Sequence, residues 1–116
     1  YVEAMWKILQ QKKPDDYVIA TGKQYSIRQF VNFVAKKLNM KITWKGKGLN
    51  EIGYDILNKK KIILVDKNYI RPLDVNTLLG NAAKARKELK WKPQMNIQTL
   101  IDEMIIEEMN ILSNDQ

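Results

Sequence analysis

The sequence predicts a mixed α/β chain that is mostly helical, with a few short strands that are too few to close a sheet alone. Apolar residues recur at helical spacing in three stretches, within residues 2–9, 27–38 and 97–112. Short runs rich in β-branched and aromatic residues lie between these stretches, as is typical of strands. The 116 residues are 45% hydrophobic, which is enough for one ordinary compact domain.

The first predicted element is a helix within residues 1–13, which Pro14 ends. Its apolar stripe consists of Val2, Met5, Trp6 and Leu9, with lysine and glutamine opposite. The helix starts at the first letter of the sequence without a capping residue. We therefore expect the chain to be part of a longer polypeptide.

A strand is predicted over residues 17–21, YVIAT, and Gly22 ends it. The run is short, β-branched and apolar on both faces, a pattern typical of buried strands in parallel sheets. Parallel neighbours arrive through long crossover connections, so we expect the partners of this strand to lie outside the sequence.

Three elements are predicted in the middle of the chain. Ser26 and Gln29 form a capping box that opens a helix over residues 27–38. The alternation in KITWK predicts a half-exposed strand at residues 42–44, after which glycines open a loop of about a dozen residues. Residues 54–61 resemble an exposed hairpin tip, and KKIILVD, residues 60–66, is the next strand. The helix at 27–38 has one apolar face, formed by Ile27, Phe30, Val31, Val34 and Leu38.

Two helices are predicted at the end of the chain. Asn81 is placed to cap a short helix over residues 82–90, which stops before Trp91 and Pro93. Asn96 is placed to cap a longer helix, whose methionines we expect to fill a core. The apolar stripe of that helix consists of Ile97, Leu100, Ile101, Met104, Ile105, Met109 and Leu112.

Composition excludes several kinds of chemistry. The chain has no cysteine and no histidine, so it can form no disulfide, thiol nucleophile, imidazole base or common zinc site. Its apolar runs are far shorter than the ~20 residues that span a bilayer, and no signal-peptide pattern opens it. These features predict a cytoplasmic protein without a membrane partner or a metal.

The net charge of +7 points to an anionic partner. Nucleic acid is not the partner we expect, because only Arg28, Arg71 and Arg86 supply the planar fork that recognition of bases and phosphates favours. The lysines are dispersed, and aromatic residues are not interleaved with them. A lysine-rich solvated surface explains the charge better.

The segment YIRPLDVNTLLG, residues 69–80, contains a candidate ligand-binding arginine. The proline after Arg71 favours an extended backbone there, which would project the guanidinium toward an anionic ligand. The alternative is a surface ion pair between Arg71 and Asp74, and from these residues alone this structural interpretation is the stronger one.

Three segments together resemble a known family. DYVIATGKQYSIRQFV (16–31), KGKGLNEIGYD (45–55) and VDKNYIRPLDVNTLLGNAAKARKELKWKP (65–93) are similar to the C-terminal part of GDP-mannose 4,6-dehydratases, which are extended short-chain dehydrogenases/reductases. The specific blocks are ATG-x-x-YS-x-R-x-F and Y-x-RP-x-[DE]-V-x-x-LLG. The ending KARKELKWKP is shared with many sugar-nucleotide epimerases and dehydratases.

The resemblance implies a two-part enzyme with an N-terminal Rossmann domain that holds NADP and a smaller C-terminal portion that closes over the GDP-sugar. Residues 1–116 resemble this second portion, and the Rossmann domain would be the missing partner. The whole enzyme would oxidise GDP-mannose at C4, remove water across C5 and C6 and return the hydride to C6, giving GDP-4-keto-6-deoxy-mannose.

The groups that perform this chemistry are missing from the sequence. None of the five glycines belongs to a G-x-G-x-x-G or G-x-x-G-x-x-G turn, and no tyrosine is followed four positions later by lysine. We therefore predict no catalytic residue, no cofactor-binding residue and no activity for this chain by itself.

The resemblance also implies substrate-binding residues. Arg71 would contact the diphosphate of the GDP-sugar and Asp74 the ribose or base, although the family commonly has glutamate at the second position. A guanidinium suits phosphate oxygens, and a carboxylate can accept from vicinal hydroxyls. Tyr25 and Arg28 open a helix after a predicted strand, the place where α/β sheets bind ligands, so they are weaker candidates.

Two hypotheses follow. In the first, the chain is the GDP-sugar-binding portion of a dehydratase, and its uncovered apolar surface promotes self-association into homo-oligomers. In the second, it is an independent small basic module that binds nucleotides or nucleic acid. An independent module should bury both the YVIAT segment and the first helix.

Overall fold

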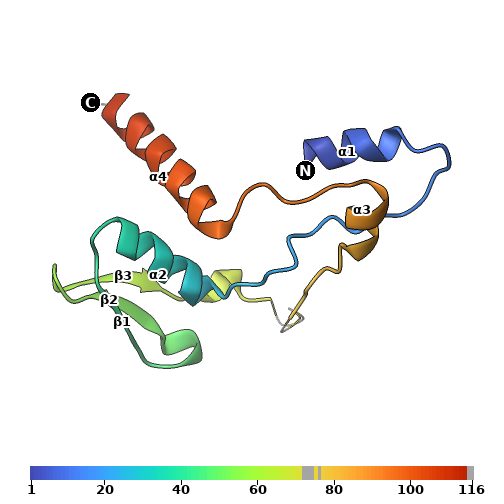
Figure 1. Cartoon of the computed structure of the whole chain (residues 1–116). Coiled ribbons are helices and arrows are strands. Elements are labelled where there is room, and N and C mark those ends of the chain that lie inside the picture. The colour runs from blue at the N-terminus through green and yellow to red at the C-terminus, as the bar shows by residue number, and fades with distance from the viewer. Residues whose placement is uncertain (72–74, 76, 115–116) are drawn as a thin grey trace. The chain divides into compact units, whose positions relative to one another are not determined.

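The computed structural model describes residues 1–71, 75 and 77–114, which divide into two compact units. The first unit comprises residues 1–24 and 75–96, and the second comprises residues 25–74 and 97–116. Each unit therefore joins segments that are distant in the sequence. The longer elements are α1 (Val2–Leu9), α2 (Ile27–Lys37), β1 (Ile42–Lys45), β2 (Ile52–Asp55), β3 (Lys60–Leu64), α3 (Ala83–Glu88) and α4 (Ile97–Asn114), labelled in Figure 1.

The first unit is held together by a small core around α1 and α3. The core is rich in alanine, whose short side chains allow the backbones of α1 and α3 to approach closely. Ile8, Tyr17, Ile19 and Ala20 pack against this core. The Asn81 side chain accepts a hydrogen bond from the Ala83 N–H at 3.0 Å, although the N-cap of α3 is Ala82 rather than the predicted Asn81. The buried core consists of Ala4, Ala82, Ala85, Leu89 and Trp91.

Helix α1 differs from its prediction in length and in the face that it buries. It ends at Leu9 rather than near residue 13, and it buries Ala4 completely. The predicted apolar stripe faces solvent, because the core of this unit forms on the Ala4 and Ile8 side of the helix. The stripe residues Val2, Met5, Trp6 and Leu9 are between 61% and 80% exposed.

The strand predicted at residues 17–21 is not formed among the described residues. Residues 11–20 have no helix or strand, and no described segment forms a ladder with YVIAT. A strand requires a hydrogen-bonded neighbour, which local pattern alone does not provide. Ala20 instead packs against Gly80, where an added Cβ would lie 2.6 Å from the Ala20 Cβ, and Val18 stays 53% exposed.

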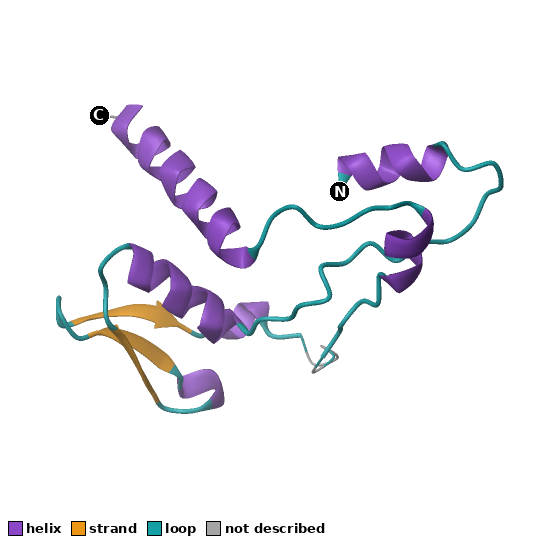
Figure 2. Ribbon diagram, in the orientation of Figure 1, coloured by secondary structure: helices purple, strands orange, loops and turns teal. Residues whose placement is uncertain are grey.

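The second unit contains a three-stranded antiparallel sheet with the order β1-β2-β3 (Figure 2). Strands β1 and β3 confirm their predictions. Strand β2 corrects the predicted loop and the predicted tip at residues 54–61, since the chain pairs through Asp55 and turns only after it. Gly53 is required by close packing, because an added Cβ would lie 2.9 Å from the Ile63 Cβ.

Helix α2 begins with the predicted capping box. The Ser26 hydroxyl accepts from the Gln29 N–H at 3.1 Å, and the Gln29 side chain accepts from the Ser26 N–H at 2.8 Å. Among the predicted apolar face, Ile27 and Leu38 are 79% and 43% exposed, while Phe30, Val31 and Val34 are half-buried. The predicted amphipathic helix is therefore confirmed, although the first and last residues of its predicted face are exposed.

Helix α4 packs against α2 in the second unit. Ile101 is buried, and Lys37 of α2 forms a salt bridge with Asp102 of α4 at 2.6 Å. The expectation that methionines fill a core is wrong for this helix, since Met104 and Met109 are 47% and 58% exposed. Only part of the predicted stripe meets a neighbour among the described residues.

Asp55 is a buried carboxylate at the end of β2, and sequence analysis did not identify it. It accepts hydrogen bonds from the Asn58 side-chain amide at 2.5 Å, the Leu57 N–H at 3.1 Å and the Lys41 N–H at 3.4 Å. Burial raises the pKa of Asp55, but these hydrogen bonds outweigh burial, and the net pKa lies below its usual value. The carboxylate thus closes the β2–β3 turn and ties it to the start of β1.

We expect the second unit to lose stability in acid because of Asp55. A carboxyl whose folded-state pKa is depressed stabilises the fold above its unfolded-state pKa of about 4, and this stabilisation is lost as pH falls through the folded-state pKa. The Trp44 indole N–H resonance, followed by NMR during an acid titration, should report this transition. Asp55→Asn should remove the acid-dependent step and lower the midpoint temperature at neutral pH by roughly 5–10 °C. An unchanged acid transition in Asp55→Asn would contradict this role.

Candidate functional site

Arg71 lies on the surface of the second unit, two residues after the end of a short 3-10 helix, Lys67–Tyr69. Asp66 fixes the start of that helix by accepting a hydrogen bond from the Asn68 N–H at 2.9 Å. Ile70, just before the arginine, has extended dihedral angles, φ −76° and ψ 129°. None of the ion pairs among the described residues includes Arg71. Its side chain is exposed.

The predicted partner of Arg71, Asp74, lies outside the described residues. The interpretation of the two as a surface ion pair and the interpretation of Asp74 as a ribose ligand both stay predictions.

Arg28 stands in the first turn of α2 and already has partners within its unit. Its guanidinium forms a salt bridge with Glu51, and it lies over the Trp44 ring at 5.3 Å from the ring centroid. The Trp44 indole N–H in turn donates to the Asn32 side chain at 3.0 Å. With its side chain 54% exposed, Arg28 joins α2 to β1 and to the loop before β2. Sequence analysis missed Glu51, because no local spacing links it to Arg28.

Tyr25 is half-buried just before α2. Its ring packs edge-to-face on Phe33 of the same helix, with ring centroids 5.9 Å apart. Neither the ring contact of Tyr25 nor the ion pair and ring contact of Arg28 involves Arg71. The structure therefore describes three of the four candidates, Tyr25, Arg28 and Arg71, all in the second unit.

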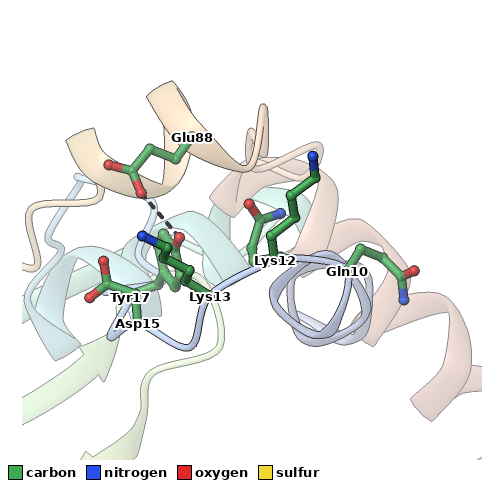
Figure 3. Close-up of a pocket in the computed structure, with 7 residues that line it drawn as sticks. Gln10, Lys12, Lys13, Asp15, Tyr17 and Glu88 are labelled. Atoms are coloured by element: carbon green, nitrogen blue, oxygen red, sulfur yellow. Dashed lines mark hydrogen bonds between the residues drawn. The ribbon is translucent and has the colours of Figure 1, made fainter.

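The first unit has a polar surface hollow of about 520 Å³ (Figure 3). The Tyr17 hydroxyl donates to the Glu88 carboxylate at 3.0 Å across it, the bond drawn as a dashed line. Its lining residues are Gln10, Gln11, Lys12, Lys13, Asp15, Tyr17 and Glu88.

Charged contacts beside this hollow fix residues 15–17 onto α3. Lys84 forms a salt bridge with Asp15 at 2.6 Å, donates to the Asp16 carbonyl at 3.0 Å and lies 4.8 Å from the centre of the Tyr17 ring. The hydrogen bond with Lys84 lowers the pKa of Asp15, and the same bond raises the pKa of Lys84. Burial, followed by the hydrogen bond to Glu88, raises the pKa of Tyr17. These contacts fix residues 15–17 to α3 and include Tyr17, the first residue of YVIAT.

Two kinds of feature are not found in the part of the chain that the structure describes. No three histidine, cysteine, aspartate or glutamate side chains come together as metal ligands there. No described helix combines the length and the apolar character needed to cross a membrane.

The described residues define a mixed α/β chain in which Arg71 is exposed and takes part in none of the ion pairs found among them. The sequence model of the family described as GDP-mannose 4,6 dehydratase matches residues 1–104. The chain therefore belongs to the GDP-mannose 4,6-dehydratase family, as the motif analysis indicated.

The chain is similar to curated relatives across almost its whole length. It is 44% identical to "GDP-mannose 4,6 dehydratase 2" of Caenorhabditis elegans over 99% of this chain and 30% of that protein. It is 40% identical to "GDP-mannose 4,6 dehydratase" of Drosophila melanogaster over 97% of this chain and 28% of the relative. For the human "GDP-mannose 4,6 dehydratase" the identity is 39%, over 97% of this chain and 30% of the relative. The chain thus spans about a third of the length of these relatives or less.

Proposed function

We propose that this chain is the C-terminal, GDP-sugar-binding portion of a GDP-mannose 4,6-dehydratase, an NADP-dependent lyase of the extended short-chain dehydrogenase/reductase type. In the whole enzyme the NADP-bearing Rossmann portion oxidises GDP-mannose at C4, and the product is GDP-4-keto-6-deoxy-mannose. This chain supplies the surface that closes over the nucleotide. The observation that carries the proposal is the family match over residues 1–104, combined with coverage of only 28–32% of the relatives.

Arg71 is the residue that we assign to the diphosphate. It is exposed and engaged in none of the described ion pairs, in contrast to Arg28, which is paired with Glu51. A guanidinium gives charge-assisted, bidentate hydrogen bonds to phosphate oxygens, which lysine cannot reproduce. Arg71 therefore grips the pyrophosphate, and Arg28 supports the unit that presents it.

The residues of this chain do not fit NADP. A dinucleotide site needs glycines at the turn between a strand and a helix, so that the backbone can approach the pyrophosphate. At Gly46, Gly53 and Gly80 an added Cβ would clash with another atom of the chain, so these backbones are already packed against the protein itself. Gly48 and Gly22 have room for a side chain, but Gly48 belongs to a three-residue 3-10 helix, and no second glycine follows Gly22 before Gly46. No step of the redox chemistry is therefore assigned to residues 1–116.

Exposed apolar surface supports the fragment hypothesis over that of an independent module. An independent module should bury its first helix and the YVIAT segment, whereas Trp6 and Leu9 are 61% and 80% exposed and Val18 is 53% exposed. Apolar surface of this kind is typical of a face that packs on a further segment.

The decisive experiment compares the chain alone with a chimera in which it replaces the matching segment of the 44% identical Caenorhabditis elegans relative. With GDP-mannose and NADP, the chain alone should form no 4-keto product, and the chimera should form it. The relative lacking that segment is the matched control and should be inactive. Turnover by the chain alone would refute the proposal.

The independent-module hypothesis is tested by binding. A nucleic-acid-binding module should bind oligonucleotides with an affinity that falls steeply as salt rises. Under our proposal, oligonucleotide binding should be weak. Tight oligonucleotide binding with a steep salt dependence would instead favour the independent module.

A further inference from the structure

The segment that carries Arg71 has no buried side chain. Every residue from Leu64 to Arg71 is exposed, and Tyr69 is 81% exposed. Strand β3 ends at Leu64, so its ladder with β2 stops well before the arginine. Neither core packing nor a strand ladder among the described residues therefore fixes the backbone that leads to Arg71. Hydrogen bonds within the segment must do so.

Asp66 accepts two of the hydrogen bonds that shape this backbone. Its side-chain Oδ1 accepts from the Asn68 N–H at 2.9 Å, and its carbonyl oxygen accepts from the Tyr69 N–H at 3.2 Å. A further bond runs from the Ile70 N–H to the Lys67 carbonyl oxygen at 3.3 Å. Together these bonds close the short 3-10 helix and deliver the chain to Ile70 in an extended conformation.

The Asp66 side chain is the part of this network that depends on residue type, because the other two bonds join backbone to backbone. An N-cap carboxylate satisfies a backbone donor that the helix cannot pair by itself. None of the ion pairs among the described residues includes Asp66. Its observed role is thus to cap the helix two residues before which the sheet ends and after which the arginine follows.

We propose that Asp66 is a positioning residue for Arg71, which it presents to the nucleoside diphosphate by holding the short 3-10 helix closed. The inference rests on the proposed function, because it takes the diphosphate as the ligand of Arg71. When only a fraction of the molecules present a binding residue correctly, the apparent affinity falls by that fraction. Asp66 therefore contributes to affinity without touching the ligand, since it orders in advance a segment that would otherwise become ordered on binding.

Substitution of Asp66 in the chimeric enzyme tests the positioning role. The KM for GDP-mannose and the kcat are measured for the original chimera, Asp66→Ala and Asp66→Asn. Asp66→Ala removes the acceptor and should raise the KM roughly 3- to 10-fold, with kcat within about 2-fold. Asp66→Asn keeps an acceptor oxygen and should return the KM to within about 2-fold of the original. Rescue by asparagine would show that the cap, rather than the negative charge, sets the KM.

Asn81→Ala is the matched control. The Asn81 side chain makes the same kind of contact in the first unit, where it accepts from the Ala83 N–H at 3.0 Å. Loss of this bond should leave the KM within about 2-fold, because Asn81 does not belong to the segment that carries Arg71.

The double variant Asp66→Ala, Arg71→Ala separates positioning from a direct role. If Asp66 acts through Arg71, Asp66→Ala should raise the KM of the original chimera but add less than about 2-fold once the arginine is gone. An equal increase in both backgrounds would overturn the positioning role, as would an active chimera whose KM is insensitive to Asp66→Ala. An inactive original chimera would instead refute the proposed function, and the inference with it.

Discussion

Arg71→Ala is expected to raise the KM of the chimeric enzyme for GDP-mannose by roughly 10- to 100-fold, because hydrogen bonds to a charged group contribute about 1.5–3 kcal/mol. The loss should appear in binding rather than in turnover, since Arg71 holds the diphosphate in both the ground state and the transition state. Steady-state kinetics of the chimera, together with calorimetric titration of GDP, measures both effects.

Two variants make this result specific. Arg71→Lys keeps the charge but loses the planar fork, so it should lie between the original protein and Arg71→Ala. Arg86→Ala removes the same charge from an exposed position on α3 in the first unit and should leave the KM within about 2-fold, as is usual for surface substitutions. A KM that Arg71→Ala leaves unchanged would refute the assignment of this arginine to the diphosphate.

Local sequence signals predicted those elements whose causes are local. The capping box of Ser26 and Gln29 satisfies two backbone donors within one turn, so it is readable from the sequence and the structure reproduces it. Strand β1 was likewise readable from its alternation.

Elements that depend on distant partners were predicted less well. YVIAT has the composition of a buried strand, but a strand needs a hydrogen-bonded neighbour, and no described segment supplies one. Strand β2 escaped notice because Gly53 lowers its strand propensity, and only the close approach of Ile63 reveals why glycine is there.

The candidate binding residues also divide into features that are local in the sequence and features that depend on distant residues. The motif containing Arg71 was visible in the sequence, and the structure adds that the side chain is exposed. Arg28 carries the same guanidinium group, but its salt bridge with Glu51 and its position over Trp44 are visible only in the folded structure. Sequence therefore identified suitable side chains, whereas the folded chain shows which contacts Arg28 makes within its unit.

Gly46→Ala is expected to be among the most destabilising single substitutions in the second unit. Gly46 has φ +80°, and a Cβ there would overlap the carbonyl oxygen of Asn50 and lie 2.9 Å from its carbonyl carbon. The clash involves backbone, which cannot rotate away as a side chain could. The cost of placing alanine in a left-handed backbone conformation and this steric overlap together should lower the free energy of unfolding by about 2–4 kcal/mol. This is a large share of the ~5–15 kcal/mol typical of a domain.

Gly48→Ala is the matched control, because Gly48 also has a positive φ, +56°, but no atom lies within 4 Å of its added Cβ. It should cost only the backbone strain, about 1–2 kcal/mol. Urea unfolding of both variants, followed through the Trp44 indole resonance, separates steric overlap from strain. Equal destabilisation by the two substitutions would contradict the role of the Asn50 carbonyl. The turn at Gly46 leads to Glu51, the partner of Arg28, so Gly46→Ala should also release the Arg28 guanidinium from Trp44 and shift that resonance before unfolding begins.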